Sequence, residues 1–361
     1  MGDVFGYKRM LLIGFLWYAL WAMVAGLSAY SDHVLFIFAR VLCGIGPSIC
    51  LPNSLAILGA TYPPGLKKQL LFGLFTDLSP LGIVTGAATA GAFSLLWWPW
   101  AYWSTSVFLV LIELVGTWAI PDPPRKTCAR ICSVKSAIVE LDLAAGVIGI
   151  TALILINFAW NQAVVVRWQE AYVYVTLIIG LALVPGFFYV EIYISPSPLI
   201  PLEAINVDVA FVLSCLACAW GYFGIWIYYI WQQFEVFHGL SPLHASAWKI
   251  PMVPMAFVAS IVTGYLSGRL HPATLMIAAE VCTLVSSILA ATSPPDQIYW
   301  TQLFPCLLIA PWGLDLSFPA ATLMLSNAVS REHQGVAASL VNIVVNYSIA
   351  LRLGFAGTIE H

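Results

Sequence analysis

Residues 171–193 read AYVYVTLIIGLALVPGFFYVEIY, and Glu191 is the one charged residue among them. A helix that crosses a bilayer needs about 20 consecutive apolar residues, and this run supplies them. The strands of a membrane barrel instead alternate polar and apolar positions over about 10 residues. The run therefore predicts a transmembrane helix and argues against a barrel strand.

Further apolar runs of comparable length occur along the whole 361-residue chain. The first of them can also be read as a signal peptide, but it is longer than the usual apolar region of about 7–15 residues, and many spans follow it. The sequence therefore predicts an all-α, multi-pass membrane protein of about 11 transmembrane helices. The expected spans lie near residues 10–30, 34–60, 70–94, 97–120, 142–161, 171–193, 207–232, 246–268, 273–292, 298–325 and 335–358.

The composition points to the same class of protein. Hydrophobic residues make up 61% of the chain and charged residues only 9%, against about 25% charge in a soluble domain. So small a charged fraction cannot cover the surfaces of the two or three soluble domains that roughly this length forms. The net charge of −3, without a basic patch, excludes nucleic acid as a partner. The expected surroundings are a lipid bilayer, most simply the plasma membrane.

The basic residues predict which side of the membrane each loop faces. Cytoplasmic loops carry an excess of Lys and Arg. With the N-terminus in the cytoplasm and an odd number of spans, the C-terminus lies outside. In that orientation, the cytoplasmic side holds most of the 14 basic residues, namely Lys8, Arg9, Lys67, Lys68, Arg125, Lys126, Arg130, Lys135, Arg269 and Arg331.

Two proline-rich cytoplasmic breaks divide the spans into groups of four, two and five. The first break, over residues 121–141, holds three prolines and four basic residues, and the second, over residues 195–201, holds three further prolines. We therefore expect an incomplete N-terminal bundle over residues 1–120. A cytoplasmic loop with two linking helices over residues 121–205 and an incomplete C-terminal bundle over residues 206–361 follow it.

A short glycine-rich motif occurs twice, next to cytoplasmic turns. Residues 2–9 read GDVFGYKR and residues 264–269 read GYLSGR. Both resemble the loop signature of the major facilitator superfamily, Gly-x-Leu-(Ala/Gly)-Asp-Arg-x-Gly-Arg-(Arg/Lys). Tyr7 departs from its usual basic residue, and Gly268 stands where the second copy's Asp is expected. The matching residues are Gly2, Asp3, Gly6, Lys8 and Arg9 in the first copy, and Gly264 and Arg269 in the second.

Other stretches extend the resemblance along the chain. Residues 35–46 (LFIFARVLCGIG) resemble the family's fourth-helix signature, with Cys43 in place of the usual Gln. Residues 82–91 (GIVTGAATAG) resemble the fifth-helix antiporter signature without its usual Pro, and they contain Gly82, Gly86 and Gly91. Residues 157–162 (NFAWNQ) and 315–321 (DLSFPAA) resemble fungal aminotriazole-resistance and low-affinity ammonium transporter-like members of the fourteen-helix drug:proton antiporter branch.

Arg40 is the first candidate for transport chemistry. The resemblance implies that it corresponds to the Arg linked to proton movement in antiporters. A charge inside a membrane helix costs about 2.5–3.5 kcal/mol on insertion scales, so such a residue is a candidate for function. The alternative is a structural role in which carbonyl groups of neighbouring helices bind the guanidinium, and both interpretations stay open.

Asp315 is the second candidate. It lies between Pro311 and Pro319, where we expect the helix to be broken. Broken helices free backbone carbonyls and favour ion or substrate sites. A carboxylate there can take up and release protons; in the alternative interpretation, Asp315 caps the helix that restarts after the break.

The remaining polar residues give weaker predictions. Asn342 and Asn346 share one helical face because they are four residues apart. They either line a cavity or hydrogen-bond a neighbouring helix, which is the commoner use. We expect Glu280 to lie near a helix end or to snorkel, in a solvated or paired role. We expect Cys215 and Cys218 to be small buried residues. No spacing typical of a metal site, a cofactor site or an enzyme is found.

The resemblance implies transport of a small organic molecule by alternating access, most simply proton-coupled efflux of a drug or secondary metabolite. One alternative is uptake or facilitated passage of a small cation such as ammonium. Another is a remnant that does not transport, because the first two and the last of the branch's fourteen helices fall outside this sequence. In that case, we expect the 361-residue chain to insert poorly.

Overall fold

The computed structural model describes residues 2–62, 66–120, 142–195, 199, 207–328 and 334–360. All regular structure within these ranges is helical. In chain order, the elements are α1 (Gly2–Phe5), α2 (Tyr7–Leu27), η1 (Ser28–Tyr30), α3 (His33–Thr61), α4 (Leu66–Leu96), α5 (Pro99–Ala119), α7 (Leu143–Val166), α8 (Ala171–Tyr193), α9 (Val207–Gln232), η3 (Gln233–Phe237), α10 (Pro242–Trp248), α11 (Met252–Ser267), α12 (Pro272–Ala291), α13 (Leu303–Ala328) and α14 (Gln334–Glu360).

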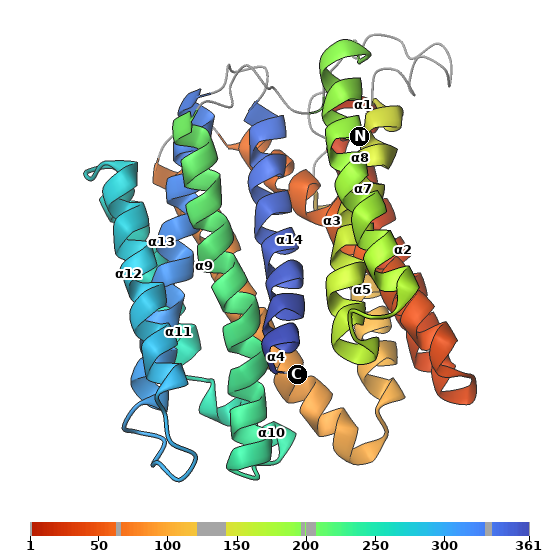
Figure 1. Cartoon of the computed structure of the whole chain (residues 1–361). Helices are drawn as coiled ribbons and strands as arrows, with labels where there is room; N and C mark the ends of the chain where they lie inside the picture. Colours follow the sequence, from red (N-terminus) through yellow and green to blue (C-terminus); the bar gives the residue numbers. More distant parts are fainter. Residues whose placement is uncertain are drawn as a thin grey trace. The chain divides into compact units, whose positions relative to one another are not determined.

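Eleven helical segments in the described part of the chain are long and apolar enough to cross a membrane (Figure 1). This finding confirms the predicted fold class and number of spans. Helices satisfy the backbone N–H and C=O groups within one segment, which a bilayer core requires because it holds no water.

The eighth span differs from the single helix expected over residues 246–268. A turn over residues 249–251 divides it into α10 and α11. Pro251 has no N–H and cannot continue the hydrogen bonding of α10. The turn is closed instead by Lys249 N, which donates to Ser246 O at 3.1 Å, and by Met252 N, which donates to Lys249 O at 3.0 Å.

The chain groups into two compact units, residues 1–129 with 239–264 and residues 130–238 with 265–361. In the first unit, α2 packs against α3 and α5. A Cβ atom added at Gly14 of α2 would lie 3.2 Å from the Gly46 carbonyl oxygen of α3. Ser106 of α5 donates a 2.7 Å hydrogen bond to the Ala19 carbonyl oxygen of α2. Small residues at close approach and interhelical hydrogen bonds are what hold membrane helices together.

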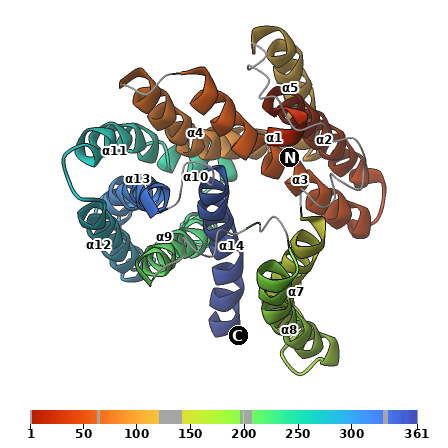
Figure 2. The ribbon, with the colours of Figure 1, turned by 90° about the horizontal axis from the view of Figure 1, so that it is seen from above.

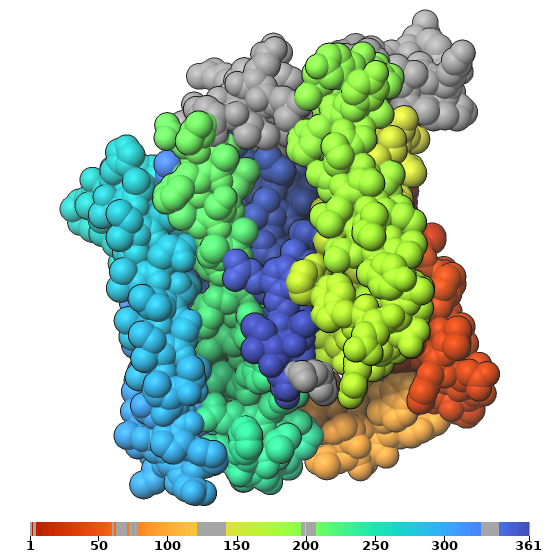
Figure 3. All heavy atoms as spheres, in the orientation of Figure 1, coloured from red at the N-terminus to blue at the C-terminus, as the bar shows by residue number. Residues whose placement is uncertain are grey.

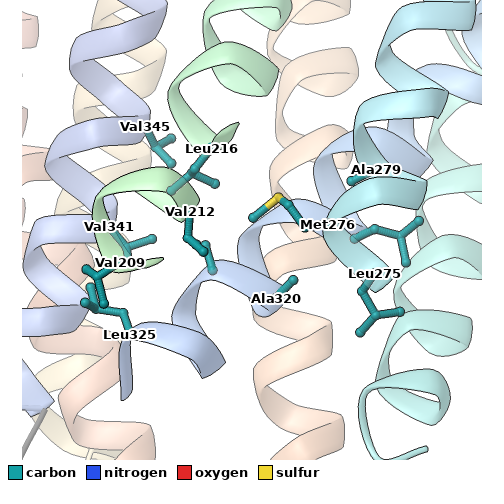
Figure 4. Packing of buried hydrophobic residues seen from close by; sticks show 12 residues of the cluster. Val209, Val212, Leu216, Leu275, Met276, Ala279, Ala320, Leu325, Val341 and Val345 are labelled. Carbon is teal, nitrogen blue, oxygen red and sulfur yellow. The ribbon is translucent and has the colours of Figure 1, made fainter. Parts of the chain in front are cut away.

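In the second unit, α9, α12, α13 and α14 enclose a cluster of buried apolar side chains. Figure 4 shows its members converging from these four helices. Because lipid tails are as apolar as these side chains, close packing rather than removal from water stabilises the cluster. Its members are Val209, Val212, Leu216, Leu275, Met276, Ala279, Leu316, Ala320, Ala321, Leu325, Val341 and Val345.

The second unit also contains α7 and α8, which pack against each other as a pair (Figure 2). In the space-filling view, their side chains form one continuous column (Figure 3). α14 lies against α7, where a Cβ atom at Gly354 would be 3.1 Å from Trp160 Cβ. The Tyr347 hydroxyl of α14 donates a 3.3 Å hydrogen bond to the Leu153 carbonyl oxygen of α7.

Candidate functional site

Arg40 lies on an exposed face of α3, beside aromatic side chains. Its guanidinium carbon is 5.7 Å from the centroid of the Tyr102 ring of α5, within cation–π range. Phe36 and Trp98 pack edge-on against that ring, at 5.6 and 5.9 Å between centroids. Among the described residues, Arg40 has no acidic partner. The first unit therefore holds a positive charge that is oriented by a ring and open on one side.

The loop motif over residues 2–9 forms α1 and the start of α2. Gly6 separates the two helices with φ = 94°, a left-handed conformation that favours glycine. A Cβ atom at Gly2 would collide with side chains of α2 and α3, so the motif approaches both helices closely. Lys8 is half-buried and Arg9 is exposed, while the side chain of Asp3 lies outside the described residues.

The second copy of the motif is arranged differently. Gly264 is a helical residue of α11, so it is not part of the expected turn, and no described atom lies within 4 Å of an added Cβ. The turn begins at Gly268. There, the guanidinium carbon of Arg269 lies 4.0 Å from the centroid of the Tyr265 ring.

The glycine row of α4 has two parts. Gly82 and Gly86 face open space, with no described atom within 4 Å of an added Cβ. At Gly91, an added Cβ would lie 3.2 Å from Leu243 N and from the Pro242 carbonyl carbon of α10. Gly91 thus permits close approach of α10, whereas the other two leave a smooth open face.

Asp315 lies in the middle of α13, and 5% of its surface is exposed. The helix runs unbroken from Leu303 to Ala328 through Pro311 and Pro319, so both the expected break and the capping interpretation are wrong. Prolines are tolerated in membrane helices when neighbouring helices and small adjustments satisfy the affected backbone groups. α13 has such neighbours, because it packs against α9, α12 and α14.

Two contacts fix α13 on either side of Asp315. Two residues after it, Ser317 accepts a 3.2 Å hydrogen bond from Trp220 Nε1 of α9. Two residues before it, Gly313 admits α12 so closely that an added Cβ would lie 3.3 Å from the Ala279 carbonyl oxygen. The carboxyl group is therefore carried on a segment with little freedom to move.

Asn342 and Asn346 lie on α14, one turn apart. Asn346 Nδ2 donates a 2.8 Å hydrogen bond to the Asn342 carbonyl oxygen, and the Asn346 side chain is exposed. Both asparagines share the second unit with Asp315, whereas Arg40 belongs to the first unit.

Two positions of the second unit differ from what the sequence predicts. Glu280 lies in the middle of α12, half-buried, and not near a helix end as expected. Cys218 is exposed and Cys215 is half-buried, so the expectation that both are buried is wrong. Arg352 lies inside the last span and contacts Cys218 across two helices. Its charge was visible in the sequence, but its partner was not, because only tertiary packing brings α9 and α14 together.

Known proteins of one family are similar to this chain along its length. Residues 1–351 match the model of the Major Facilitator Superfamily. The chain is 45% identical over 361 residues to the low affinity ammonium transporter of Saccharomyces cerevisiae, covering all of this chain and 70% of that protein.

Two further relatives carry other names. The efflux pump terG of Aspergillus terreus is 38% identical, and the aminotriazole resistance protein of Saccharomyces cerevisiae is 31% identical. All of this chain matches in both cases, covering 68% and 66% of the two relatives. Together with the eleven apolar helices, these matches confirm the resemblance read from the loop and helix motifs: the chain is an integral, multi-pass membrane protein that belongs to the Major Facilitator Superfamily.

Proposed function

We propose that this chain exports a small organic molecule, driven by the proton gradient across the plasma membrane. In this proposal, the substrate binds between an N-terminal bundle (residues 1–120) and a C-terminal bundle (residues 206–361), which residues 121–205 link. The two bundles open this site alternately to the two sides of the membrane. The names of three similar fungal proteins, two efflux pumps and a multidrug transporter, favour export.

The observation that carries the proposal is the position of Asp315. It is a carboxyl group in the middle of a membrane span, and only 5% of its surface is exposed. Ionisable groups at this depth are costly and mark ion or proton pathways. Taking up a proton removes the charge, so protonation of Asp315 is energetically coupled to the packing around α13.

Arg40 supports the proposal from the other unit. It provides a permanent positive charge next to the Tyr102 ring, on a face that is open in the described residues. Such a charge attracts anions and repels protons and other cations, so it can separate proton entry from substrate release.

Passage of ammonium is the second candidate function. It is favoured by the 45% identity to a low affinity ammonium transporter. A buried carboxylate such as Asp315 suits a small cation as well as a proton, so the site chemistry does not by itself separate the two functions.

Proteoliposomes with an imposed pH gradient test the proposal, with aminotriazole as the export probe and methylammonium as the cation probe. We expect gradient-driven aminotriazole transport that a protonophore abolishes. Asp315→Asn should lose this transport but keep gradient-free exchange. Asp296→Asn, at an exposed loop position, is the matched control and should behave as wild type.

The outcomes separate the candidates. Transport of methylammonium alone contradicts the export proposal and supports the second candidate. Export that persists after the gradient is collapsed contradicts proton coupling. Unchanged gradient-driven export by Asp315→Asn contradicts the assigned role of that carboxyl group.

A further inference from the structure

Arg352 crosses the contact between α14 and α9, two helices of the second unit that pack along each other (Figure 1). Its Nη2 donates a 3.5 Å hydrogen bond to Cys218 Sγ of α9. A Cβ atom at Gly221 would lie 2.5 Å from Arg352 Cγ and 3.3 Å from both Cδ and Nε. The absence of a side chain at Gly221 therefore creates the notch that holds the stem of the arginine.

This notch lies deep in the membrane span. Gly221 is near the middle of the segment Val207–Phe237, which contains α9 and crosses the membrane. At 1.5 Å per residue, the guanidinium lies roughly 16–21 Å along α9 from its first residue. Since the hydrocarbon core is about 30 Å thick, this depth is well away from the lipid phosphates at either surface.

Among the described residues, the hydrogen-bond partner of Arg352 is the Cys218 thiol and not a carboxylate. Two acidic residues lie inside spans of neighbouring helices of this unit, Asp315 of α13 and Glu280 of α12, and Glu280 interacts electrostatically with Cys215. Glu360, on the same helix as Arg352, is about 12 Å further along it and accepts a 2.8 Å hydrogen bond from the Tyr229 hydroxyl. The acidic residues of α9 and η3, Asp208 and Glu235, are each about 20 Å along the helix from the notch. α7, which also packs against α14, has no acidic residue between its ends.

We propose that Arg352 binds a carboxylate or similar anionic group of the transported molecule. The inference rests on the proposed function in taking the ligand to be the transport substrate. A guanidinium offers a planar fork of donors that matches a carboxylate, and it keeps its charge in a dry environment. A permanent charge at membrane depth needs a partner, and within the described residues Arg352 faces a neutral thiol. The substrate anion provides that partner.

Thiol labelling of Cys218 tests the site without relying on transport. We would label the purified full chain in phosphatidylcholine nanodiscs with an anionic sulfonatoethyl or a cationic trimethylammonioethyl methanethiosulfonate. Peptide mass spectrometry then gives the rate at each cysteine. We expect Cys218 to react about fivefold faster, or more, with the anionic reagent than with the cationic one. A fivefold ratio corresponds to the attraction energy of two unit charges 4 Å apart in water. Arg352→Gln should abolish this preference, and Arg352→Lys should retain it.

Cys215 provides the matched control on the same helix. It lies close enough to Glu280 to interact with that carboxylate electrostatically, so it should not share the preference of Cys218 for the anionic reagent. Equal rates for the two reagents at Cys218, or the same preference at Cys215, overturn the proposal. So does a preference that survives in Arg352→Gln.

Protection by a ligand identifies the source of the anion. Benzoate should slow the reaction of Cys218 with neutral N-ethylmaleimide, and benzamide, its uncharged counterpart, should not. Replacing phosphatidylcholine by anionic phosphatidylglycerol should leave the rate unchanged. Slowing by the anionic lipid alone overturns the assignment to a substrate, because it places a headgroup at Arg352.

Transport separates binding from a structural role. Arg352→Gln should raise the KM for a carboxylate probe at least tenfold relative to wild type and leave the KM for the corresponding amide unchanged. Arg167→Gln, at an exposed turn, should change neither KM. If Arg352→Gln reduces transport of both probes equally, Arg352 has a structural role and the proposal is overturned. If wild type exports aminotriazole but transports neither of these probes, the assignment of the anion to the substrate is overturned and the proposed export function stands. If it exports none of the three, the export function fails, while the labelling result still decides whether an anion site exists.

Discussion

The Tyr222 hydroxyl of α9 donates a 2.7 Å hydrogen bond to Ser286 Oγ of α12, and Ser286 lies 3.3 Å from Cys306 Sγ of α13. Trp226 Nε1 of α9 donates to the same sulfur at 3.1 Å. Ser286 and Cys306 are fully buried. Three helices therefore share one buried polar cluster in this unit, and this cluster fixes their register along the membrane normal.

Removing either the donor or the acceptor of the hydrogen bond between Tyr222 and Ser286 should destabilise the second unit. We expect Tyr222→Phe and Ser286→Ala each to lower the free energy of unfolding by about 0.6–1.7 kcal/mol, the range for hydrogen bonds between membrane helices. The double variant should lose much less than the sum, because both changes remove the same bond. Unfolding in mixed micelles measures all three, with Tyr228→Phe, at an exposed position of α9, as the control. Strictly additive losses would show that the bond contributes nothing.

The contact between α12 and α13 should be sensitive to a single methyl group. A Cβ at Gly313 would collide with Thr283 Cγ2 and lie 3.3 Å from the Ala279 carbonyl oxygen. We therefore expect Gly313→Ala to destabilise the protein by about 1–3 kcal/mol, the usual cost of overpacking. Gly186→Ala in α8, where no described atom lies within 4 Å of an added Cβ, is the matched control. Equal stability of the two variants contradicts the close approach.

Helix number and class could be predicted from the sequence because each span is a long, continuous apolar run. The effect of prolines could not. Pro251 lies in a turn that divides the eighth span, whereas Pro311 and Pro319 lie inside an unbroken helix. A proline removes one N–H in every case, and whether the helix continues depends on what packs around it. That information resides in the neighbouring helices and not in the local sequence.

The candidate site, too, could be predicted from the sequence only in part. The sequence identified Asp315 and Arg40 because a charge in an apolar run is conspicuous. It misjudged Glu280, which lies well inside α12 although the expected bounds of this helix, 273–292, nearly match the observed ones. It did not reveal the notch at Gly221 either, because nothing around this glycine indicates which residue of which helix fills the space.

Substitutions at the glycines of α4 should distinguish an effect on helix packing from an effect on transport. Gly91→Ala would bring a Cβ to 3.2 Å from the backbone of α10, so we expect lower thermal stability. Gly86 faces open space, so Gly86→Leu should leave stability unchanged. If that open face borders the substrate path, Gly86→Leu should reduce transport severalfold. Thermal unfolding and substrate export, measured on both variants, check the two effects. A loss of stability at Gly86 without loss of transport contradicts this division.

Export should depend on both the charge and the planar shape of the Arg40 side chain. Its guanidinium carbon lies 5.7 Å from the centroid of the Tyr102 ring, and a lysine ammonium, which is a compact and strongly hydrated charge, makes this contact less well. We expect Arg40→Ala to abolish export driven by a pH gradient while membrane insertion stays intact. Arg40→Lys should recover only a small part of it.

Two comparisons make the test of Arg40 specific. Asp32→Asn removes another exposed charge of the same unit, outside the loop motif, and should leave gradient-driven export near the wild-type rate. Tyr102→Leu removes the ring but not the charge, and it should reproduce most of the defect of Arg40→Lys, because both variants weaken the contact between the cation and the ring. Full recovery by Arg40→Lys would mean that charge alone suffices. Normal export by Arg40→Ala would assign this arginine to structure, leaving Asp315 as the remaining candidate for proton coupling.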